Sequence, residues 1–172
     1  MKLNMIWLAA ALGAGILVAS LVPGPFNTVT RVRPGGAGFL QSAQLDPVAV
    51  ATIRRACGNC HSNETAWPWY SRVAPASWLL RKDVSDGRKF LNFSVWPEYG
   101  IEGQGQLLAL AARDLKRGSM PPRRYSAIHA DARSSPRERT DLIAALEGES
   151  ARLLETERSN HSPESTSSRG VR

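Results

Sequence analysis

The sequence predicts an all-α fold, in which a small helical domain with long loops follows an N-terminal apolar helix. Three observations lead to this fold class. Four segments between residues 45 and 157 carry apolar residues at three- and four-residue spacing. The one segment that alternates like a strand, residues 91–95, has no evident partner strand. A Cys-x-x-Cys-His motif directly follows the first of the helical segments.

The chain has 172 residues, 42% of them hydrophobic, which is enough for one domain with extensions. We divide it into a signal sequence or membrane anchor (1–22), a flexible linker (23–44), the domain (45–157) and a disordered tail (158–172). The linker is rich in Pro and Gly and has no apolar period. The tail is mostly Ser, Thr, Glu and Arg, which cannot bury a core.

The N-terminal segment begins Met1-Lys2 and continues as an apolar run to Val22. Its length is close to the roughly 20 residues that span a bilayer, which favours an uncleaved anchor. A cleaved signal sequence stays open, although Val18-Ala19-Ser20 only loosely resembles a cleavage site. Either interpretation places the domain outside the cytoplasm.

The first helix of the domain begins at Asp46-Pro47, because Asp is a good N-cap and Pro suits the first helical position. Val50, Ile53 and Cys57 share one face of this helix at three- and four-residue spacing. The helix therefore delivers Cys57 from its buried side, directly into the cysteine motif.

The motif Cys57-Gly58-Asn59-Cys60-His61 is the attachment signature of c-type haem. Two thiols at this spacing form thioether bonds with the porphyrin, and the adjoining imidazole reaches the iron. The sequence therefore predicts one haem c, held by Cys57 and Cys60, with His61 as the proximal iron ligand.

Three other interpretations of the motif fit less well. A zinc site needs about four ligands, and outside the motif only His129 and His161 are histidines. A thioredoxin-like redox pair would begin a helix after a strand, whereas this motif follows a helix. A short-loop disulfide between the two cysteines is the remaining alternative.

The second helix begins at Pro75, with Trp78, Leu79 and Val84 as expected inward residues and Gly87 near its end. We expect residues 91–95 to form an extended segment on the core. The glycines at 100, 103 and 105 predict a flexible loop before a third helix over residues 104–116. Its expected inward residues are Leu107, Leu108, Ala111 and Leu115.

The last helix begins with a capping box at Ser135-Pro136-Arg137-Glu138. Its expected apolar face consists of Leu142, Ile143, Leu146 and Leu153.

An aromatic-rich segment follows the haem motif. It contains Trp67, Trp69, Tyr70, Trp78 and Trp96, more large aromatic area than a small helical domain needs for packing alone. Each tryptophan has two interpretations, as a wall of the haem site or as ordinary core.

The segment Ser62-Asn-Glu-Thr-Ala-Trp-Pro-Trp-Tyr70, together with the preceding motif and Arg117-Gly-Ser-Met-Pro-Pro122, resembles the bacterial haem-binding domain family of small monohaem c-type proteins. The resemblance covers residues 45–146. It implies a cytochrome c-like helical domain wrapped around one covalently bound haem. In class I cytochromes c the first and last helices cross beside the haem motif, and the order of helices here permits that crossing.

Met120 is the predicted distal iron ligand, because a thioether on the second axial position stabilises the reduced iron. Pro121 and Pro122 stiffen the chain after it and favour an extended conformation at Met120. A core-filling methionine is the other interpretation. His129 is the rival distal ligand, and His161 lies in the expected tail.

The net charge of +7 suits an anionic membrane surface or an acidic redox partner, and no nucleic-acid-binding motif is present. Candidate steering charges near the methionine are Arg113, Lys116, Arg123 and Arg124. The predicted function is one-electron transfer by a periplasmic cytochrome, anchored to the inner membrane and loaded by the cytochrome c maturation machinery. A haem-based sensor or ligand-binding module, or a peroxidase-like enzyme using His129, are the alternatives.

Overall fold

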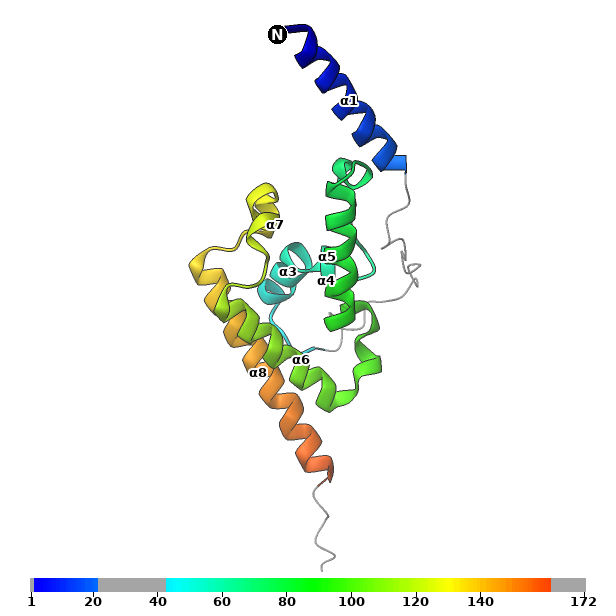
Figure 1. Cartoon of the computed structure of the whole chain (residues 1–172). Coiled ribbons are helices and arrows are strands. Elements are labelled where there is room, and N and C mark those ends of the chain that lie inside the picture. The colour runs from blue at the N-terminus through cyan, green and yellow to red at the C-terminus, as the bar shows by residue number, and fades with distance from the viewer. Residues whose placement is uncertain (1, 22–42, 162–172) are drawn as a thin grey trace, which may run out of the picture.

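The computed structural model describes residues 2–21 and 43–161, and these residues form helices and loops without a strand (Figure 1). The all-α prediction is confirmed. The α-helices are α1 (Lys2–Leu21), α3 (Pro47–Ala56), α4 (Gly58–His61), α5 (Ala76–Phe90), α6 (Gly100–Arg117), α7 (Arg123–Ile128) and α8 (Pro136–His161). The 3₁₀ helices are η1 (Trp69–Arg72), η2 (Phe93–Tyr99) and η3 (Ala130–Ala132). The predicted linker over 23–44 lies outside the described residues, apart from its last two.

Helix α1 projects from one end of the molecule (Figure 1). Its segment Asn4–Leu21 has a mean hydropathy of 1.8 and is 0% buried. By length and composition it can cross a membrane, and a signal sequence near an N-terminus would look the same.

Helix α3 begins as predicted. The Asp46 carboxylate accepts hydrogen bonds from the backbone N–H groups of Val48 and Ala49, both at 2.9 Å. These bonds satisfy donors that a helix N-terminus leaves without partners. The buried face of α3 comprises Ala49, Thr52 and Ile53. The helix ends at Ala56, and Cys57 is its C-cap residue.

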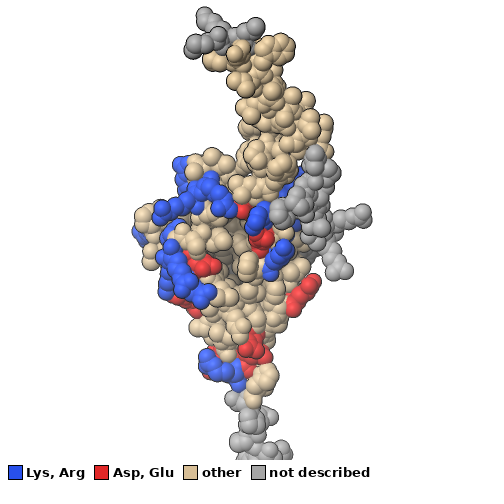
Figure 2. Space-filling model, in the orientation of Figure 1, with Lys and Arg blue, Asp and Glu red and all other residues tan. Residues whose placement is uncertain are grey.

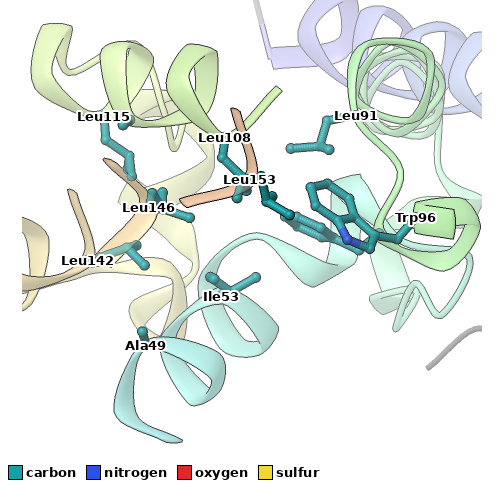
Figure 3. Packing of buried hydrophobic residues seen from close by; sticks show 11 residues of the cluster. Ala49, Ile53, Leu91, Trp96, Leu108, Leu115, Leu142, Leu146 and Leu153 are labelled. Carbon is teal, nitrogen blue, oxygen red and sulfur yellow. The ribbon is translucent and has the colours of Figure 1, made fainter. Parts of the chain in front are cut away.

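Helices α6 and α8 pack along each other and form most of the core (Figure 3). Gly105 allows the close approach, since a Cβ there would lie 2.7 Å from the Leu154 Cγ. The Ser150 hydroxyl donates to the Gly105 carbonyl at 2.7 Å. The predicted inward residues Leu108, Leu115, Leu142, Leu146 and Leu153 are all buried.

The first and last helices of the domain also meet, as the resemblance to class I cytochromes implies. Ala49 and Ile53 of α3 belong to the same buried cluster as Leu142 and Leu146 of α8 (Figure 3). The main partner of α8 is nevertheless α6.

Two predictions about the middle of the chain are wrong. Helix α6 begins at Gly100, so the glycines predicted to form a loop lie in its first turns. Burial of Gly105 against α8 compensates for the poor helix propensity of glycine. Residues 93–99 form the 3₁₀ helix η2 rather than an extended segment, and the Asn92 side chain caps it by accepting from the Ser94 N–H at 3.0 Å.

Two further expectations need correction. Leu79 is 48% exposed, whereas Val84 is buried as predicted. The last helix continues through residues 158–161, which were assigned to a disordered tail. Ion pairs one turn apart, including His161 with Glu157, support this extension of α8. Residues 162–172 lie outside the described residues.

Candidate haem-binding site

A cavity of about 460 Å³ opens between the cysteine motif, α5, α6 and the start of α7. This volume lies within the roughly 300–1,000 Å³ that is usual for cofactor sites. Apolar residues form most of the wall, including Ile53, Phe90, Leu91, Phe93, Leu107, Leu108, Leu110, Ala111, Leu115, Leu142 and Leu146. Figure 2 shows the face of the molecule hollowed, with acidic and basic side chains around the hollow.

Both cysteines of the motif line this cavity, and both are free thiols. Helix α3 ends at Cys57, and a single turn of helix then carries Cys60 and His61, whose N–H groups bond the Cys57 carbonyl at 3.2 and 3.0 Å. Burial raises the pKa of Cys57 to about 12 and that of Cys60 to about 11. Both thiols are therefore neutral at neutral pH in the chain as it stands.

The His61 imidazole also lines the cavity, and its orientation is fixed. Its Nδ1 lies 2.9 Å from the Leu91 carbonyl oxygen, which can only accept, so Nδ1 carries the proton. This tautomer leaves the Nε2 lone pair free for a metal. Burial lowers the pKa of His61, which favours the neutral form that a metal ligand needs.

Met120 lines the same cavity from the turn between α6 and α7 and is 36% exposed. Helix α6 ends at Gly118, whose left-handed conformation (φ 69°) redirects the chain. The Ser119 N–H then bonds the Asp114 carbonyl at 3.1 Å, and the Arg139 guanidinium donates to the Met120 carbonyl at 3.5 Å. Two cysteines, one histidine and one methionine thus converge on one apolar cavity.

The model of a family described as "Haem-binding domain" matches residues 22–147. The chain belongs to the haem-binding domain family. No curated protein and no solved structure gave a significant match. The cavity suits the group that the family binds, because an apolar volume of this size with an oriented imidazole and paired thiols fits a porphyrin with a central iron. Within the described residues no cluster of three or more His, Cys, Asp and Glu side chains could hold a metal ion instead.

His129 does not line the cavity of the haem-binding domain. Its Nδ1 bonds the Tyr125 carbonyl at 2.9 Å, and its Nε2 lies 2.5 Å from the Tyr70 hydroxyl. The ring also stacks on Tyr125 with 3.9 Å between centroids. Since both ring nitrogens are engaged, this arrangement favours neither iron ligation nor acid–base catalysis by His129. His161 lies at the far end of α8 and bonds only within that helix.

The tryptophans do not wall the haem cavity. Trp96 is 1% exposed and lies in the core beside Phe93, whereas Trp69 is 82% exposed. Trp67 contacts the Arg81 guanidinium, 5.9 Å from the ring centroid. The core interpretation fits Trp96, and none of the tryptophans lines the described cavity.

The polar residues that follow the cysteine motif hold its loop in place. The Arg88 side chain donates to the Ser62 carbonyl and to the Thr65 hydroxyl, both at 2.8 Å. The Asn63 N–H donates to the Ser94 hydroxyl at 2.9 Å, and the Asn92 amide donates to the Asn63 side chain at 3.0 Å. The Ser-Asn-x-Thr part of the family segment thus fastens the motif to α5 and η2.

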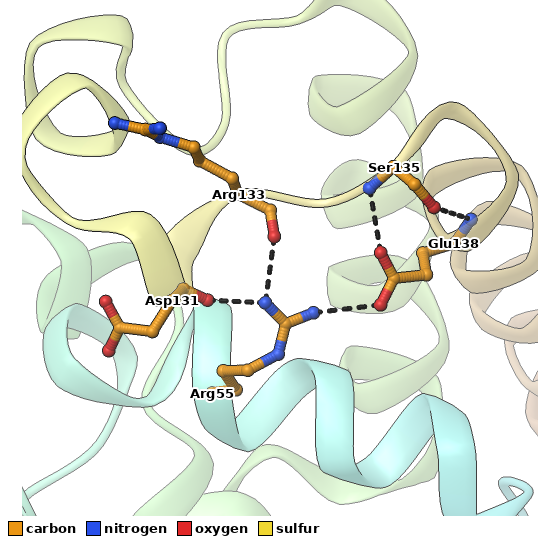
Figure 4. Close-up of polar contacts among 5 residues, drawn as sticks. All are labelled: Arg55, Asp131, Arg133, Ser135 and Glu138. Carbon is orange, nitrogen blue, oxygen red and sulfur yellow. Dashed lines mark hydrogen bonds and ion pairs between the residues drawn. The ribbon is translucent and has the colours of Figure 1, made fainter.

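Two residues that sequence reasoning missed support the motif from either side. Gly87 of α5 packs directly on it, since a Cβ there would lie 2.7 Å from the Cys60 carbonyl oxygen. Arg55, two residues before Cys57, donates to the carbonyls of Asp131 and Arg133 at 2.6 and 2.8 Å and pairs with Glu138 at 3.1 Å (Figure 4).

The Glu138 that receives Arg55 is also part of the predicted capping box. Its carboxylate accepts from the Ser135 N–H at 2.8 Å, and its own N–H donates to the Ser135 hydroxyl at 3.1 Å (Figure 4). The start of α8 and the end of α3 are therefore joined through one carboxylate. Only Ser135 and Glu138 carry a recognisable sequence signal, because the partners of Arg55 are backbone carbonyls about 80 residues away.

Proposed function

We propose that this haem-binding domain is a monohaem c-type cytochrome that carries single electrons outside the cytoplasm. Cys57 and Cys60 hold the porphyrin as thioethers, and His61 and Met120 supply the axial ligands. The observation that carries the proposal is the convergence of these four side chains on one apolar cavity. When bound there, haem supplies one-electron iron chemistry.

The residues of the chain prepare the site for that chemistry. The Leu91 carbonyl orients His61 and keeps Nε2 available. The apolar wall of the cavity excludes water and so favours a low reorganisation cost on electron transfer. A thioether ligand from Met120 would raise the reduction potential, as it does in cytochromes c.

The test is the full chain expressed in a host with a c-type maturation system. We expect pigment that resists acid–acetone extraction and gives a pyridine haemochrome spectrum of the c type. The Cys57→Ser/Cys60→Ser double variant is expected to lose its haem on the same extraction. Extractable haem in the wild-type chain would disprove covalent attachment while leaving haem binding intact.

The exposure of Met120 favours a second candidate, a haem-based sensor of small ligands. A methionine that is 36% exposed in a turn can be displaced more easily than a buried one. A sensor would bind carbon monoxide rapidly in the ferrous state at neutral pH. An electron carrier would bind it slowly, because Met120 would have to leave first.

The same proposal places the domain in the periplasm, anchored to the inner membrane by α1, with an acidic redox partner. Arg113 and Arg124 line the cavity, which Asp83, Asp86 and Asp114 also line, so the two arginines are the candidate contacts for an acidic partner within a rim of mixed charge. Lys116 and Arg124 also form ion pairs, with Glu147 at 2.5 Å and Asp83 at 2.6 Å. Electron transfer to an acidic partner should therefore slow as salt screens these charges.

A further inference from the structure

Four exposed apolar side chains lie on η1, on the residues that flank it and on the first turn of α5, and η1 packs against α5. We call this set the apolar patch. It consists of Trp69 (82% exposed), Leu79 (48%), Trp67 (39%) and Val73 (37%). None of these side chains lines the haem cavity. These side chains are therefore exposed outside the described cavity, and their exposure calls for an explanation of its own.

The chemistry of the patch suits the headgroup region of a lipid bilayer. Tryptophan is enriched at membrane surfaces because its ring is apolar and its indole N–H is polar. Basic side chains accompany the rings here: Arg72 is exposed beside Trp69, and Arg81 lies over the Trp67 ring. Arginine side chains near a membrane surface are attracted to anionic lipid headgroups.

The position of the patch favours a bilayer over a protein partner. The Ala74 N–H, beside Val73, donates to the Ser20 hydroxyl at 3.1 Å, and Ser20 lies one residue before the end of α1. Figure 1 shows α1 leaving the molecule at the end where α5 begins. Lys and Arg side chains gather on the half of the domain below α1 (Figure 2).

We propose that this patch rests in the headgroup layer of the membrane that α1 spans, as a second contact that orients the domain. The inference depends on the proposed anchoring by α1. Helix α5 rises about 1.5 Å per residue, so its cavity-lining residues Asp83 to Phe90 lie roughly 6 to 16 Å along the helix axis from Leu79. The contact would keep the far part of the cavity, at Phe90, away from the headgroup layer and open to a soluble partner.

The test uses the full haem-loaded chain in nanodiscs that contain anionic lipid and a lipid with a photoreactive diazirine near its headgroup. After illumination, cross-linked peptides are identified by mass spectrometry. We expect cross-links both in α1 and in the peptide covering residues 67–79. Trp69→Ser should lower the yield in residues 67–79 several-fold without changing the yield in α1. The matched control is Val48→Ser on α3, which removes a side chain of similar exposure (68%) and should change neither yield.

The outcomes separate the patch from the anchor. Cross-links in α1 without cross-links in residues 67–79 would overturn the membrane contact and leave the anchor standing. If each disc held two chains and the patch did not cross-link to lipid, the partner of the patch would be a second copy of the chain, and the membrane contact would be overturned. Cross-links in residues 67–79 alone would overturn the proposal as stated, because the patch would then be the sole membrane contact and not a second one. An absence of cross-links in both would overturn both proposals.

Discussion

The two sides of the haem cavity are built differently. On the histidine side, the Cys57–His61 motif packs directly on α5 at Gly87. Arg88 and Asn92 donate hydrogen bonds to the following loop, and the Ser94 hydroxyl accepts one from it. On the methionine side, Met120 is partly exposed in a turn that closes α6 through backbone hydrogen bonds of Gly118 and Ser119. The Met120 carbonyl itself accepts one hydrogen bond, of 3.5 Å, from Arg139. The histidine side is a packed structure, whereas the methionine side is an end-of-helix turn.

This difference indicates a division of work. If His61 binds the iron as proposed, the histidine side must stay fixed, because His61 then needs one tautomer and one orientation to present Nε2. The proposed role of the methionine side requires only a thioether within reach, and a turn capped by Gly118 provides it. We therefore expect variants of the histidine side to affect haem retention and folding, and variants of the methionine side to affect spectrum and ligand binding.

The largest expected effect comes from removing the two ligands separately. His61→Ala should lower the yield of haem-loaded protein by more than the roughly 10–100-fold that loss of an outer-shell partner costs at a metal site. Met120→Ala should keep its covalent haem and bind carbon monoxide readily in the ferrous state. Haem staining on denaturing gels and visible spectra measure the two effects. Equal loss of haem in both variants would remove the proposed division.

The next effect tests the packing of the histidine side. Gly87→Ala places a methyl group against the Cys60 carbonyl, and we expect a loss of about 1–3 kcal/mol in the free energy of unfolding. Gly148→Ala on α8 is the matched control, since no atom lies within 4 Å of its Cβ position. Better helix propensity should make that variant more stable by about 0.5–1 kcal/mol. Chemical denaturation monitored by circular dichroism measures both changes in the free energy of unfolding, which should have opposite signs.

A benchmark of stability alone comes from Glu149, which is 4% exposed on α8 and does not line the cavity. Its carboxylate accepts from Arg152 at 2.6 and 2.7 Å and from the Gln44 N–H at 3.0 Å. Burial alone would raise the pKa of Glu149, but these hydrogen bonds hold it below its ordinary value. Its contribution is therefore complete at neutral pH and is lost as the pH falls below the unfolded value of about 4.3 and through the lower folded one.

We expect Glu149→Gln to lose about 1–3 kcal/mol at pH 7 and less near pH 3, with an unchanged haem spectrum. The control Glu147→Gln removes an exposed ion pair with Lys116 and should change stability by under about 0.5 kcal/mol. Urea unfolding at several pH values measures both. A spectral change in Glu149→Gln would show that α8 affects the ligands directly.

The sequence predicted the elements whose signals are local. Asp46-Pro47 and the Ser135–Glu138 capping box mark helix starts through neighbouring residues, and both are confirmed. The Cys57–His61 motif and Met120 were predicted as one site, and the fold brings them to one cavity. Their roles as ligands stay predictions.

The remaining features depend on which helices pack together. Gly105 was predicted to lie in a loop because glycine has a poor helix propensity. The packing that compensates for this, a close approach to Leu154, comes from α8 and is not visible in the local sequence. Gly87 was expected only to mark the end of the second helix, and Arg55 gave no signal, because the partners that define their roles are backbone atoms of distant segments. The exposure of Trp69 could not be predicted, because aromatic content alone does not distinguish a cofactor site from an exposed surface.

The smallest expected effect compares one phenol on each side of the cavity. The Tyr70 hydroxyl forms a hydrogen bond with His129, which lies at the end of helix α7, after Met120 in the chain. The Tyr99 hydroxyl accepts a hydrogen bond from the Asn92 N–H, which adjoins the Leu91 carbonyl that orients His61. Tyr70→Phe should cost about 0.5–1.5 kcal/mol, the net value of one hydrogen bond. Tyr99→Phe should cost about 1–3 kcal/mol, because it leaves the N–H of a buried residue without a partner.

The visible spectrum should respond more to Tyr70→Phe than to Tyr99→Phe, although Tyr99→Phe should cost more stability. Tyr70→Phe loosens the methionine side, so the weak long-wavelength ferric band of iron–methionine bonding should decrease and carbon monoxide should bind faster. Tyr99→Phe should leave both unchanged, since it acts only on the packed side. If Tyr99→Phe weakened the methionine band as much as Tyr70→Phe, the two sides would move as one unit, and exposure of Met120 would say nothing about how easily it leaves the iron.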